Sequence, residues 1–441
     1  MTSPRPAWTR YLALYALALI PRFAYAAWQH QPFDGTYWAL ADGLLHDGSL
    51  SIDGRLTTDF EFGYPLFLAA CRLIVGSNQP WVQAVQIAVA ALGAPLMYRL
   101  TATLTRQTAA ASLGAALFAV DPLLIRQAVQ HSEASLTTML LLGFTCLFTG
   151  AATTTRTAAA AGIVLGLAIA TRTMLAPLVV GGALIWLAHR RYRAALVFAI
   201  AAFVVVAPLA ARNARLNGSW TPTRGGANLF VGNHPYAAAL LPTYDVDRLE
   251  PLGYELVRAR VPFLPESVEY DRLADRILTQ EAIAYMTAAP WRTAVQKLKN
   301  VLYLFSPRTI PYRVGGSAVV VTADGRVIVE GSEARPAFET IVCPVFYSLV
   351  LACAAAGMYL RRGELRADAM LWCILATFAA VYSVYFPATR YRGPMAFVLI
   401  FYAAVAVTRP AGPDATATPL ASATSGSADN RTSSGRSACG A

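Results

Sequence analysis

The 441-residue chain has few charged residues and almost no lysine. Only 14% of its residues are Asp, Glu, Lys or Arg, and the lysines are Lys297 and Lys299. Hydrophobic residues make up 56% of the chain and the mean hydropathy is +0.45, above the roughly 45–50% apolar content of soluble domains. The few charges separate long apolar runs, as in a chain that repeatedly crosses a hydrocarbon core about 30 Å thick. The composition therefore excludes an ordinary water-soluble protein.

Several familiar motifs are also missing from the sequence. It contains no G-x-S-x-G, no P-loop lysine and no Gly-rich dinucleotide fingerprint in a strand–helix context, which disfavours cytosolic nucleotide chemistry. Five of the six cysteines lie in or beside apolar runs without C-x-x-C spacing, so we expect buried structural thiols. The net charge of +11 comes from residues in short loops and not from one basic stripe, so no nucleic-acid partner is expected.

Apolar runs of about 17–25 residues predict ten transmembrane helices. They lie near residues 11–28, 81–104, 109–125, 133–151, 158–171, 174–189, 194–211, 338–360, 368–386 and 391–408. The first run is long enough to span and lacks a clear small-residue cleavage site, so we expect a membrane helix there and not a removed signal peptide.

Arginines in the short loops predict the orientation. They are Arg5, Arg10, Arg99, Arg106, Arg156, Arg190, Arg191, Arg193, Arg361, Arg362, Arg366 and Arg409. With an even number of spans these arginines fall on one side of the membrane, which the positive-inside rule makes cytoplasmic. We therefore expect a multi-pass protein of the cytoplasmic membrane with both termini in the cytoplasm, and with segments 29–80 and 212–337 on the opposite, outer side.

This topology divides the chain into four parts. Residues 1–211 form an N-terminal transmembrane module with a first outer loop at 29–80, and residues 212–337 form an extracytoplasmic cap segment. Residues 338–408 supply the C-terminal transmembrane helices. The Ala-, Ser-, Thr- and Gly-rich stretch 409–441 cannot bury a core, so we expect a disordered cytoplasmic tail.

Both outer segments show local patterns. In the first, apolar residues from Tyr37 to Leu45 at helical spacing predict a helix lying at the interface, and an apolar run at 64–75 predicts a return to the membrane. In the second, the pattern predicts a helix at 266–286, another from Pro290 to near Phe305, and a hairpin turning at Asp324-Gly325. The predicted fold class is thus an all-α polytopic membrane protein with a small α+β extracytoplasmic segment.

Two carboxylates lie where a catalytic base is expected. Asp34 follows the first membrane helix by a few residues, at the membrane–water boundary, where it can act as a base or simply cap the helix that follows. Glu133 opens the fourth span, and carboxylates near membrane depth are costly and tend to be functional. Its alternative role is to stabilise the helix N-terminus, with Ser132 as the cap.

Arginines at the predicted outer ends of the spans form a third group: Arg172, Arg212, Arg215, Arg390 and Arg392. The positive-inside rule makes arginine less expected there. A guanidinium suits phosphate oxygens and can neutralise a phosphate leaving group. The alternative is that each side chain snorkels toward lipid headgroups.

A metal site finds little support in the sequence. The possible ligands in the first outer loop are His30, His46, Asp47, Asp53, Asp59 and Glu61. Their spacing matches no known ligand motif. We therefore expect a solvated acidic loop and no metal or other cofactor, although a divalent ion stays an alternative.

Several short motifs in order along the chain carry a resemblance to a known family. They are Asp34 with Tyr37, Tyr64-Pro65-Leu66-Phe67, Ser132-Glu133, Arg212-Asn213, Gly218, Gly225-Gly226, Asn228, Gly232-Asn233-His234-Pro235 and Arg390-Tyr391-Arg392-Gly393-Pro394. Up to about Arg409 the chain resembles the GT-C-type membrane glycosyltransferases that use polyprenyl-phosphate sugars. This group contains the protein mannosyltransferases and the lipid A aminoarabinose transferases.

The resemblance implies an inverting sugar transfer on the outer face of the membrane. Asp34 would be the base, and Glu133 would orient the acceptor or the donor sugar. Donor and lipid-phosphate binding would fall to Tyr37, Arg172, Arg212, Arg390 and Arg392. The implied partners are a polyprenyl-phosphate-linked sugar donor, membrane lipids, and a lipid, glycan or protein acceptor.

Two functions of other classes remain as alternatives. A transporter or flippase for a lipid-linked saccharide predicts ionisable residues deep within the spans, whereas most charges here lie at span ends. A non-catalytic membrane scaffold predicts that Asp34 and Glu133 are dispensable.

Overall fold

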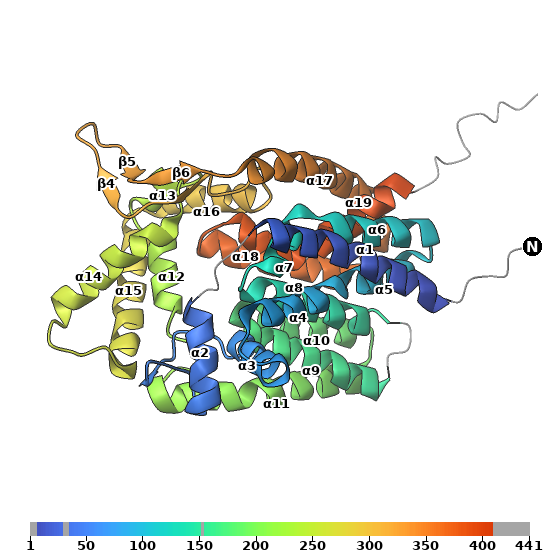
Figure 1. The fold of residues 1–441 in the computed structure, drawn as a ribbon, viewed down its shortest axis with the longest axis horizontal. Helices are drawn as coiled ribbons and strands as arrows, with labels where there is room; N and C mark the ends of the chain where they lie inside the picture. The colour runs from blue at the N-terminus through green and yellow to red at the C-terminus, as the bar shows by residue number, and fades with distance from the viewer. Residues whose placement is uncertain (1–6, 30–34, 151–153, 409–441) are drawn as a thin grey trace, which may run out of the picture. The chain divides into compact units, whose positions relative to one another are not determined.

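A computed structural model describes residues 7–29, 35–150 and 154–408, most of which are helical (Figure 1). The predicted base Asp34 and the predicted tail at 409–441 lie outside the described residues. The account below concerns the unit that ends at Thr408.

The N-terminal part contains eleven of the described helices. They are α1 (Ala7–Trp28), α2 (Gly35–His46), α3 (Gly63–Val75), α4 (Gln79–Ala91), α5 (Gly93–Thr105), α6 (Thr108–Val120), α7 (Pro122–Val129), α8 (Glu133–Phe148), α9 (Thr155–Thr171), α10 (Pro177–Ala188) and α11 (Tyr192–Asn217). Two short strands, β1 (Ser51–Ile52) and β2 (Arg55–Leu56), pair between α2 and α3. A 3-10 turn, η1 (Thr173–Leu175), precedes α10. The expected interfacial helix is α2, and the expected return segment is α3.

Local sequence explains where several of these helices begin and end. Asp121 accepts hydrogen bonds from the backbone amides of Leu123 and Leu124, and Pro122 occupies the first position of α7, where a missing N–H costs nothing. The chain therefore bends by 50° between α6 and α7. At its far end α11 stops at Gly218, whose φ of +75° few other residues adopt.

The count of ten spans is not confirmed. Within the described residues, five helical segments are long and apolar enough to cross a membrane, or six if the bent pair α6–α7 is one span. The five are Trp8–Trp28, Gln79–Thr105, Tyr192–Asn217, Phe338–Leu360 and Thr389–Thr408. The other predicted runs are apolar helices, but at 10–17 residues they are shorter than the ~20 residues of a straight crossing.

The cap segment, residues 212–337, holds shorter elements. Its helices after α11 are α12 (Gly225–Gly232), α13 (Ala237–Leu240), the 3-10 turn η2 (Val246–Leu249), α14 (Glu250–Arg260), α15 (Val268–Ala288) and α16 (Pro290–Leu304). Its strands are β3 (Arg313–Gly315), β4 (Val319–Val321), β5 (Val327–Val329) and β6 (Ser332–Ala334).

The local predictions for this segment are confirmed. The helix expected at 266–286 is α15, and the helix expected from Pro290 is α16. Strands β4 and β5 pair antiparallel around the expected turn, where Gly325 has a φ of +78°. The sequence did not indicate α12, α14 or the β3–β6 pair, because these elements have no strong periodicity.

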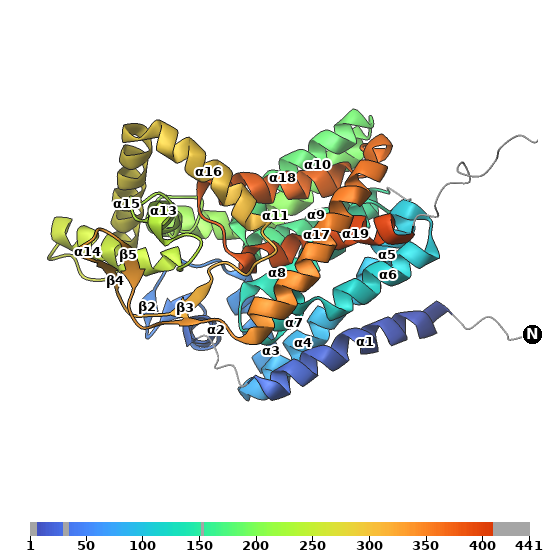
Figure 2. The ribbon, with the colours of Figure 1, turned by 90° about the horizontal axis from the view of Figure 1, so that it is seen from above.

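The C-terminal part contains the apolar helices α17 (Cys343–Leu360), α18 (Ala369–Val384) and α19 (Ala396–Thr408). The π-helical turn η3 (Phe338–Val342) precedes α17, the 3-10 turn η4 (Arg362–Glu364) precedes α18, and the 3-10 helix η5 (Thr389–Met395) precedes α19. Figure 2 shows α17 alongside α19. Residues 396–405 of α19 are all buried, so this helix lies at the centre of the main hydrophobic core.

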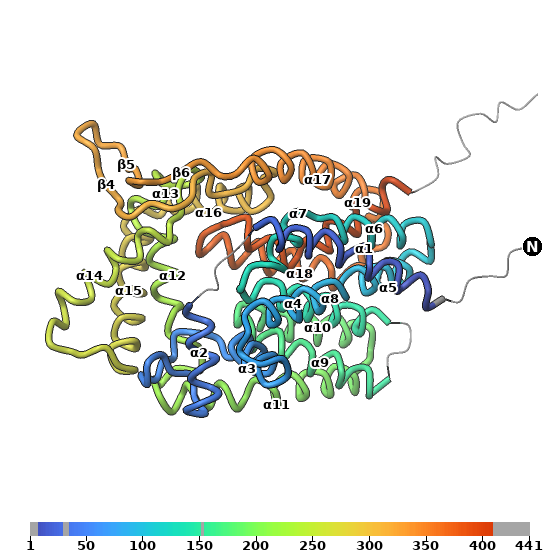
Figure 3. The backbone as a smooth tube through the Cα atoms, viewed as in Figure 1, coloured from blue at the N-terminus to red at the C-terminus, as the bar shows by residue number. Residues whose placement is uncertain are grey.

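The cap segment lies at one end of the apolar helices. In Figures 1 and 3 the helices α12, α14 and α15 gather beyond the ends of α8, α9 and α18. The long α11 runs from the apolar helices to the cap segment, where it contacts α15. A cavity lies where the two sets of elements meet.

Close packing of α17 on α19 makes the first prediction. A Cβ atom at Gly357 would lie 1.9 Å from the Tyr402 backbone oxygen, whereas one at Gly363 meets nothing within 4 Å. Gly357→Ala should therefore lower the free energy of unfolding by ~1–3 kcal/mol through overpacking, measured by thermal unfolding in detergent. Gly363→Ala is the matched control and should unfold like the wild type; equal midpoints for the two variants would contradict the packing argument.

Candidate active site

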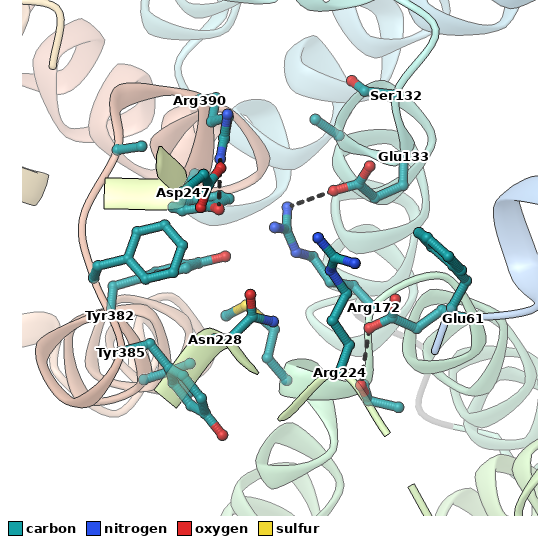
Figure 4. A pocket seen from close by; sticks show the side chains of 18 of the residues that line it. Glu61, Ser132, Glu133, Arg172, Arg224, Asn228, Asp247, Tyr382, Tyr385 and Arg390 are labelled. Atoms are coloured by element: carbon teal, nitrogen blue, oxygen red, sulfur yellow. Dashed lines mark hydrogen bonds and ion pairs between the residues drawn. The ribbon is translucent and has the colours of Figure 1, made fainter. Parts of the chain in front are cut away.

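A cavity of about 1040 Å³ separates the ends of the apolar helices from the cap segment. Nine stretches of chain line it: α2, the loop before α3, the α7–α8 junction, the turn after α9, the start of α12, η2 at Asp247, the loop at 309–311, Arg335 after β6, and α18 with η5. Figure 4 shows charged side chains from several of these stretches pointing toward one another. The cavity therefore brings together residues that lie far apart in the sequence.

Glu133 is held by two residues that the sequence also singled out. Its carboxylate accepts a hydrogen bond of 3.0 Å from the Tyr37 hydroxyl and lies 3.3 Å from a guanidinium nitrogen of Arg172. Ser132 has the extended backbone of a helix cap, but its side chain makes no capping hydrogen bond. Three of the predicted site residues are thus in direct contact.

Arg172 reaches this position because α9 ends just before it. Its backbone is extended, with φ −154° and ψ 100°, and its amide donates to the Ala168 oxygen. The guanidinium lies over the Tyr391 ring, 4.9 Å from the centroid, and Tyr391 in turn stacks on Tyr382 at 4.5 Å. The aromatic pair and Glu133 together fix the orientation of the guanidinium.

Glu61 is a further carboxylate of this wall. It lines the cavity and accepts a hydrogen bond of 3.0 Å from the Thr173 hydroxyl. Burial raises the pKa of Glu61, against the opposing effect of Arg172, because a buried carboxylate loses its hydration. The sequence indicated Glu61 only as a possible metal ligand.

Arg390 lies across the cavity from Glu133 and Arg172 (Figure 4). Its guanidinium contacts Asp247, lies 3.6 Å from Asp245 and donates to the Tyr391 hydroxyl at 3.0 Å. Burial and the neighbouring Asp247 raise the pKa of Asp245. Two facing walls therefore each present an arginine paired with acidic side chains.

A third arginine, Arg224, stands between these walls in Figure 4. It forms an ion pair of 2.9 Å with Glu250 and lies over the Phe60 ring. The sequence did not indicate Arg224 or Asp247. Arg224 directly precedes Gly225-Gly226 of the family pattern, and this adjacency is the one signal that pointed to it.

Arg212 and Arg392, the other two arginines to which the family resemblance gives donor binding, do not line this cavity. Arg212 donates to the Thr57 backbone oxygen at 3.0 Å and to Asn213. Arg392 is fully buried, lies 3.8 Å from the Tyr347 ring centroid and donates to a backbone oxygen at the end of α16. Both therefore link elements of the fold, and their predicted part in lipid-phosphate binding stays a prediction.

The possible metal ligands are not clustered. Among the described residues, which do not include His30, no group of three or more His, Cys, Asp or Glu side chains could hold a metal ion. Asp59 lines the cavity and accepts a hydrogen bond from Thr223. It joins the cavity wall as a hydrogen-bonded carboxylate.

Comparison with known proteins gives matches among solved structures only. No family model and no curated protein matches the chain. The archaeal oligosaccharyltransferase AglB from Archaeoglobus fulgidus, in complex with an inhibitory peptide and a dolichol-phosphate, matches with a TM-score of 0.48 and 14% identity over 91% of this chain and 50% of that chain. The present chain thus spans about half the length of that protein.

ArnT from Cupriavidus metallidurans is a second structure of this kind. Its apo form matches with a TM-score of 0.39 and 15% identity over 91% of this chain and 78% of that chain. The form bound to undecaprenyl phosphate gives 0.40 and 14%, over 91% and 79%. AglB and ArnT are GT-C-type glycosyltransferases, the type that the sequence resemblance names.

The raised pKa of Glu61 makes the second prediction. A carboxyl whose pKa is higher in the folded than in the unfolded state favours folding when protonated, so its contribution is lost as pH rises above the ordinary Glu value. As the pH rises above the ordinary Glu value, the wild type should therefore lose more stability than Glu61→Gln, measured as thermal midpoints across a pH series in one detergent. The same change at the exposed Glu269 should follow the wild type, and identical pH profiles for all three proteins would contradict the assignment.

Proposed function

We propose that the chain is a membrane glycosyltransferase that moves a sugar from a polyprenyl-phosphate carrier to an acceptor hydroxyl or amine. One observation carries the proposal. The carboxylate of Glu133, held by Tyr37 and Arg172, faces a second arginine, Arg390, across one cavity at the end of apolar helices. A carboxylate that orients the acceptor on one side and a cation for the leaving phosphate on the other suit an inverting displacement.

The dimensions of the cavity agree with two substrates. Its volume of about 1040 Å³ is at the upper end of the roughly 300–1,000 Å³ of ligand pockets. Because apolar helices end at the cavity, a carrier lipid can keep its prenyl chain in the bilayer while its phosphate and sugar enter. Aromatic side chains such as Tyr382, Tyr385 and Phe386 line the wall and suit the apolar faces of a sugar ring.

The proposed reaction forms one bond and breaks one. The acceptor oxygen or nitrogen attacks the anomeric carbon, its proton passes to a carboxylate, and the bond from the anomeric carbon to the phosphate oxygen breaks. Polyprenyl phosphate leaves with the electron pair of that bond. Inversion requires that the acceptor and the leaving phosphate occupy opposite faces of the sugar.

We assign the base to Asp34, with Glu133 orienting the acceptor. Asp34 directly precedes α2, and Tyr37 in the first turn of α2 donates to Glu133. Arg172, through its ion pair with Glu133, holds that carboxylate in place.

The phosphate is assigned to the arginines of the cavity, with Arg390 and Arg172 as its main ligands. A guanidinium can exchange a carboxylate for a phosphate because both present oxygens to its planar fork. Since Arg390 faces Glu133 (Figure 4), it lies on the side where the phosphate leaves an inverted sugar. Guanidiniums can supply the charge neutralisation, so we propose no metal or organic cofactor for the reaction.

The proposed membrane topology rests on the distribution of arginine along the sequence. Both termini would be cytoplasmic, and the cavity would open on the periplasmic or extracellular side of the cytoplasmic membrane, as the arginine distribution predicts. The acceptor is a lipid, glycan or protein that reaches this side.

The test follows release of polyprenyl phosphate from a panel of polyprenyl-phosphate sugars in nanodiscs. Asp34→Asn should lower kcat about 100-fold or more, the size expected for loss of a general base. Glu133→Gln should also lower the rate, because the neutral amide loses the ion pair with Arg172. Asp324→Asn, in the exposed β4–β5 turn, and Glu269→Gln, on the surface of α15, are the matched controls and should keep wild-type rates.

Each outcome has a defined meaning. A folded wild type that consumes none of the donors with acceptors present would overturn the transferase and favour a flippase or a scaffold. Full activity of Asp34→Asn would leave the transferase standing but remove Asp34 from the role of base.

A further inference from the structure

Two more arginines line the cavity at a place that the proposed reaction does not use. Arg126 lies on α7, and Arg335 directly follows β6. Glu339, in the π-helical turn η3, lies between them. We name these three residues the Arg126–Arg335 group.

Both guanidiniums of the group contact one oxygen. Arg126 lies 2.7 Å from Oε2 of Glu339, and Arg335 binds the same atom. The side chains of Arg335 and Glu339 are only 7% and 8% exposed, and that of Arg126 is 22% exposed. Arg126 also donates to the amide oxygen of Gln130, and Arg335 donates to the Pro311 backbone oxygen. The three side chains of the group are therefore held by defined contacts and are largely buried.

The Arg126–Arg335 group carries surplus positive charge. Two guanidiniums share one carboxylate, which leaves a net charge of about +1. The other arginines among the described cavity-lining residues each have at least one carboxylate of their own: Arg172 has Glu133, Arg224 has Glu250, and Arg390 has Asp245 and Asp247. Asp245, one of the two carboxylates on Arg390, also acts on Arg335, but only from farther away, so within the described part of the chain Glu339 is the one carboxylate in direct contact with either guanidinium of the group.

The lowered pKa of Arg335 agrees with this surplus of positive charge. Burial lowers the pKa of Arg335, and the neighbouring Arg126 adds to the lowering against the opposing effect of Glu339. Two like charges held close together in a buried wall are costly, and Glu339 neutralises only one of them. A phosphate or carboxylate placed beside both guanidiniums would supply a second anion with charge-assisted hydrogen bonds.

We propose that the Arg126–Arg335 group binds an anionic group, a phosphate or a carboxylate, of the acceptor. The inference rests on the proposed transferase function. A donor of that reaction brings one phosphate, for which Arg390 and Arg172 are already assigned. The guanidiniums of Arg126 and Arg335 lie in the same cavity and share one carboxylate between them, so they suit an anion on the acceptor. The acceptor class is then an acidic lipid or glycan, not a neutral one.

The test compares acceptors that differ only in charge. The probes are a short-chain alkyl glucoside, its 6-phosphate and the corresponding glucuronide, each supplied with the donor that the wild type consumes. The wild type should use at least one acidic acceptor with a kcat/KM about tenfold or more above that of the neutral glucoside, the factor that about 1.4 kcal/mol of extra binding gives. Arg335→Gln and Arg126→Gln should bring this ratio close to one while the KM for the donor stays within about twofold.

Two further variants sharpen the test. Glu339→Gln raises the net charge of the group and should increase the preference for the acidic acceptor. Arg258→Gln is the matched control, because Arg258 also pairs with a glutamate, Glu266, but does not line the cavity; it should keep the wild-type ratio. Thermal unfolding of each variant checks that it is folded.

A binding arm without donor separates this inference from the proposed function. Isothermal titration of the wild type with the glucoside 6-phosphate and the glucuronide should show tighter binding of at least one than of the neutral glucoside, and Arg335→Gln should weaken it about tenfold. The proposal is overturned if the wild type shows no such preference, or if the arginine variants raise only the KM for the donor, since the group would then bind the donor phosphate. If no donor is consumed but the binding difference holds, the transferase fails and the anion site stands.

Discussion

The ion pair between Glu133 and Arg172 is the contact on which the arrangement of the cavity depends. It joins the start of α8 to the end of α9, and through the Tyr37 hydroxyl it also fixes α2. A carboxylate at the end of an apolar helix is stable only when it is paired and hydrogen-bonded. Because the chain contains almost no lysine, guanidiniums supply these partners, and their planar forks impose direction as well as charge. On the facing wall, Asp245 and Asp247 are likewise paired with a guanidinium, that of Arg390.

Much of the fold could be predicted because apolar periodicity and capping act locally. The start of α8 at Glu133, the turn at Gly325 and the first position of α16 at Pro290 all follow from neighbouring residues. The number of spans could not be predicted in the same way. Asp121 and Pro122 interrupt an apolar run without changing its hydropathy much, so one predicted span is a bent pair of helices.

The site itself was only partly predictable, because side-chain direction depends on tertiary structure. Arg390 and Arg392 are two residues apart and looked equivalent in the sequence, yet in the 3-10 helix η5 one faces the cavity and the other is buried against Tyr347. Arg224 and Arg126 gain their meaning only from partners such as Glu250 and Glu339, which no spacing in the sequence connects to them. The sequence allowed arginines at the outer ends of the spans to be recognised as a group. It did not show which of them line the cavity and which link elements of the fold.

The length of α11 has a geometric consequence for the cavity. Its 26 residues extend over about 39 Å at 1.5 Å per residue, whereas the hydrocarbon core is about 30 Å thick. The helix therefore extends to the cap segment, and Arg212 near its end donates to the Thr57 backbone oxygen. One residue more or fewer would shift the elements that follow by about 1.5 Å and rotate them by about 100°, so the length of this single helix sets where cap residues such as Arg224 and Asp247 reach the cavity.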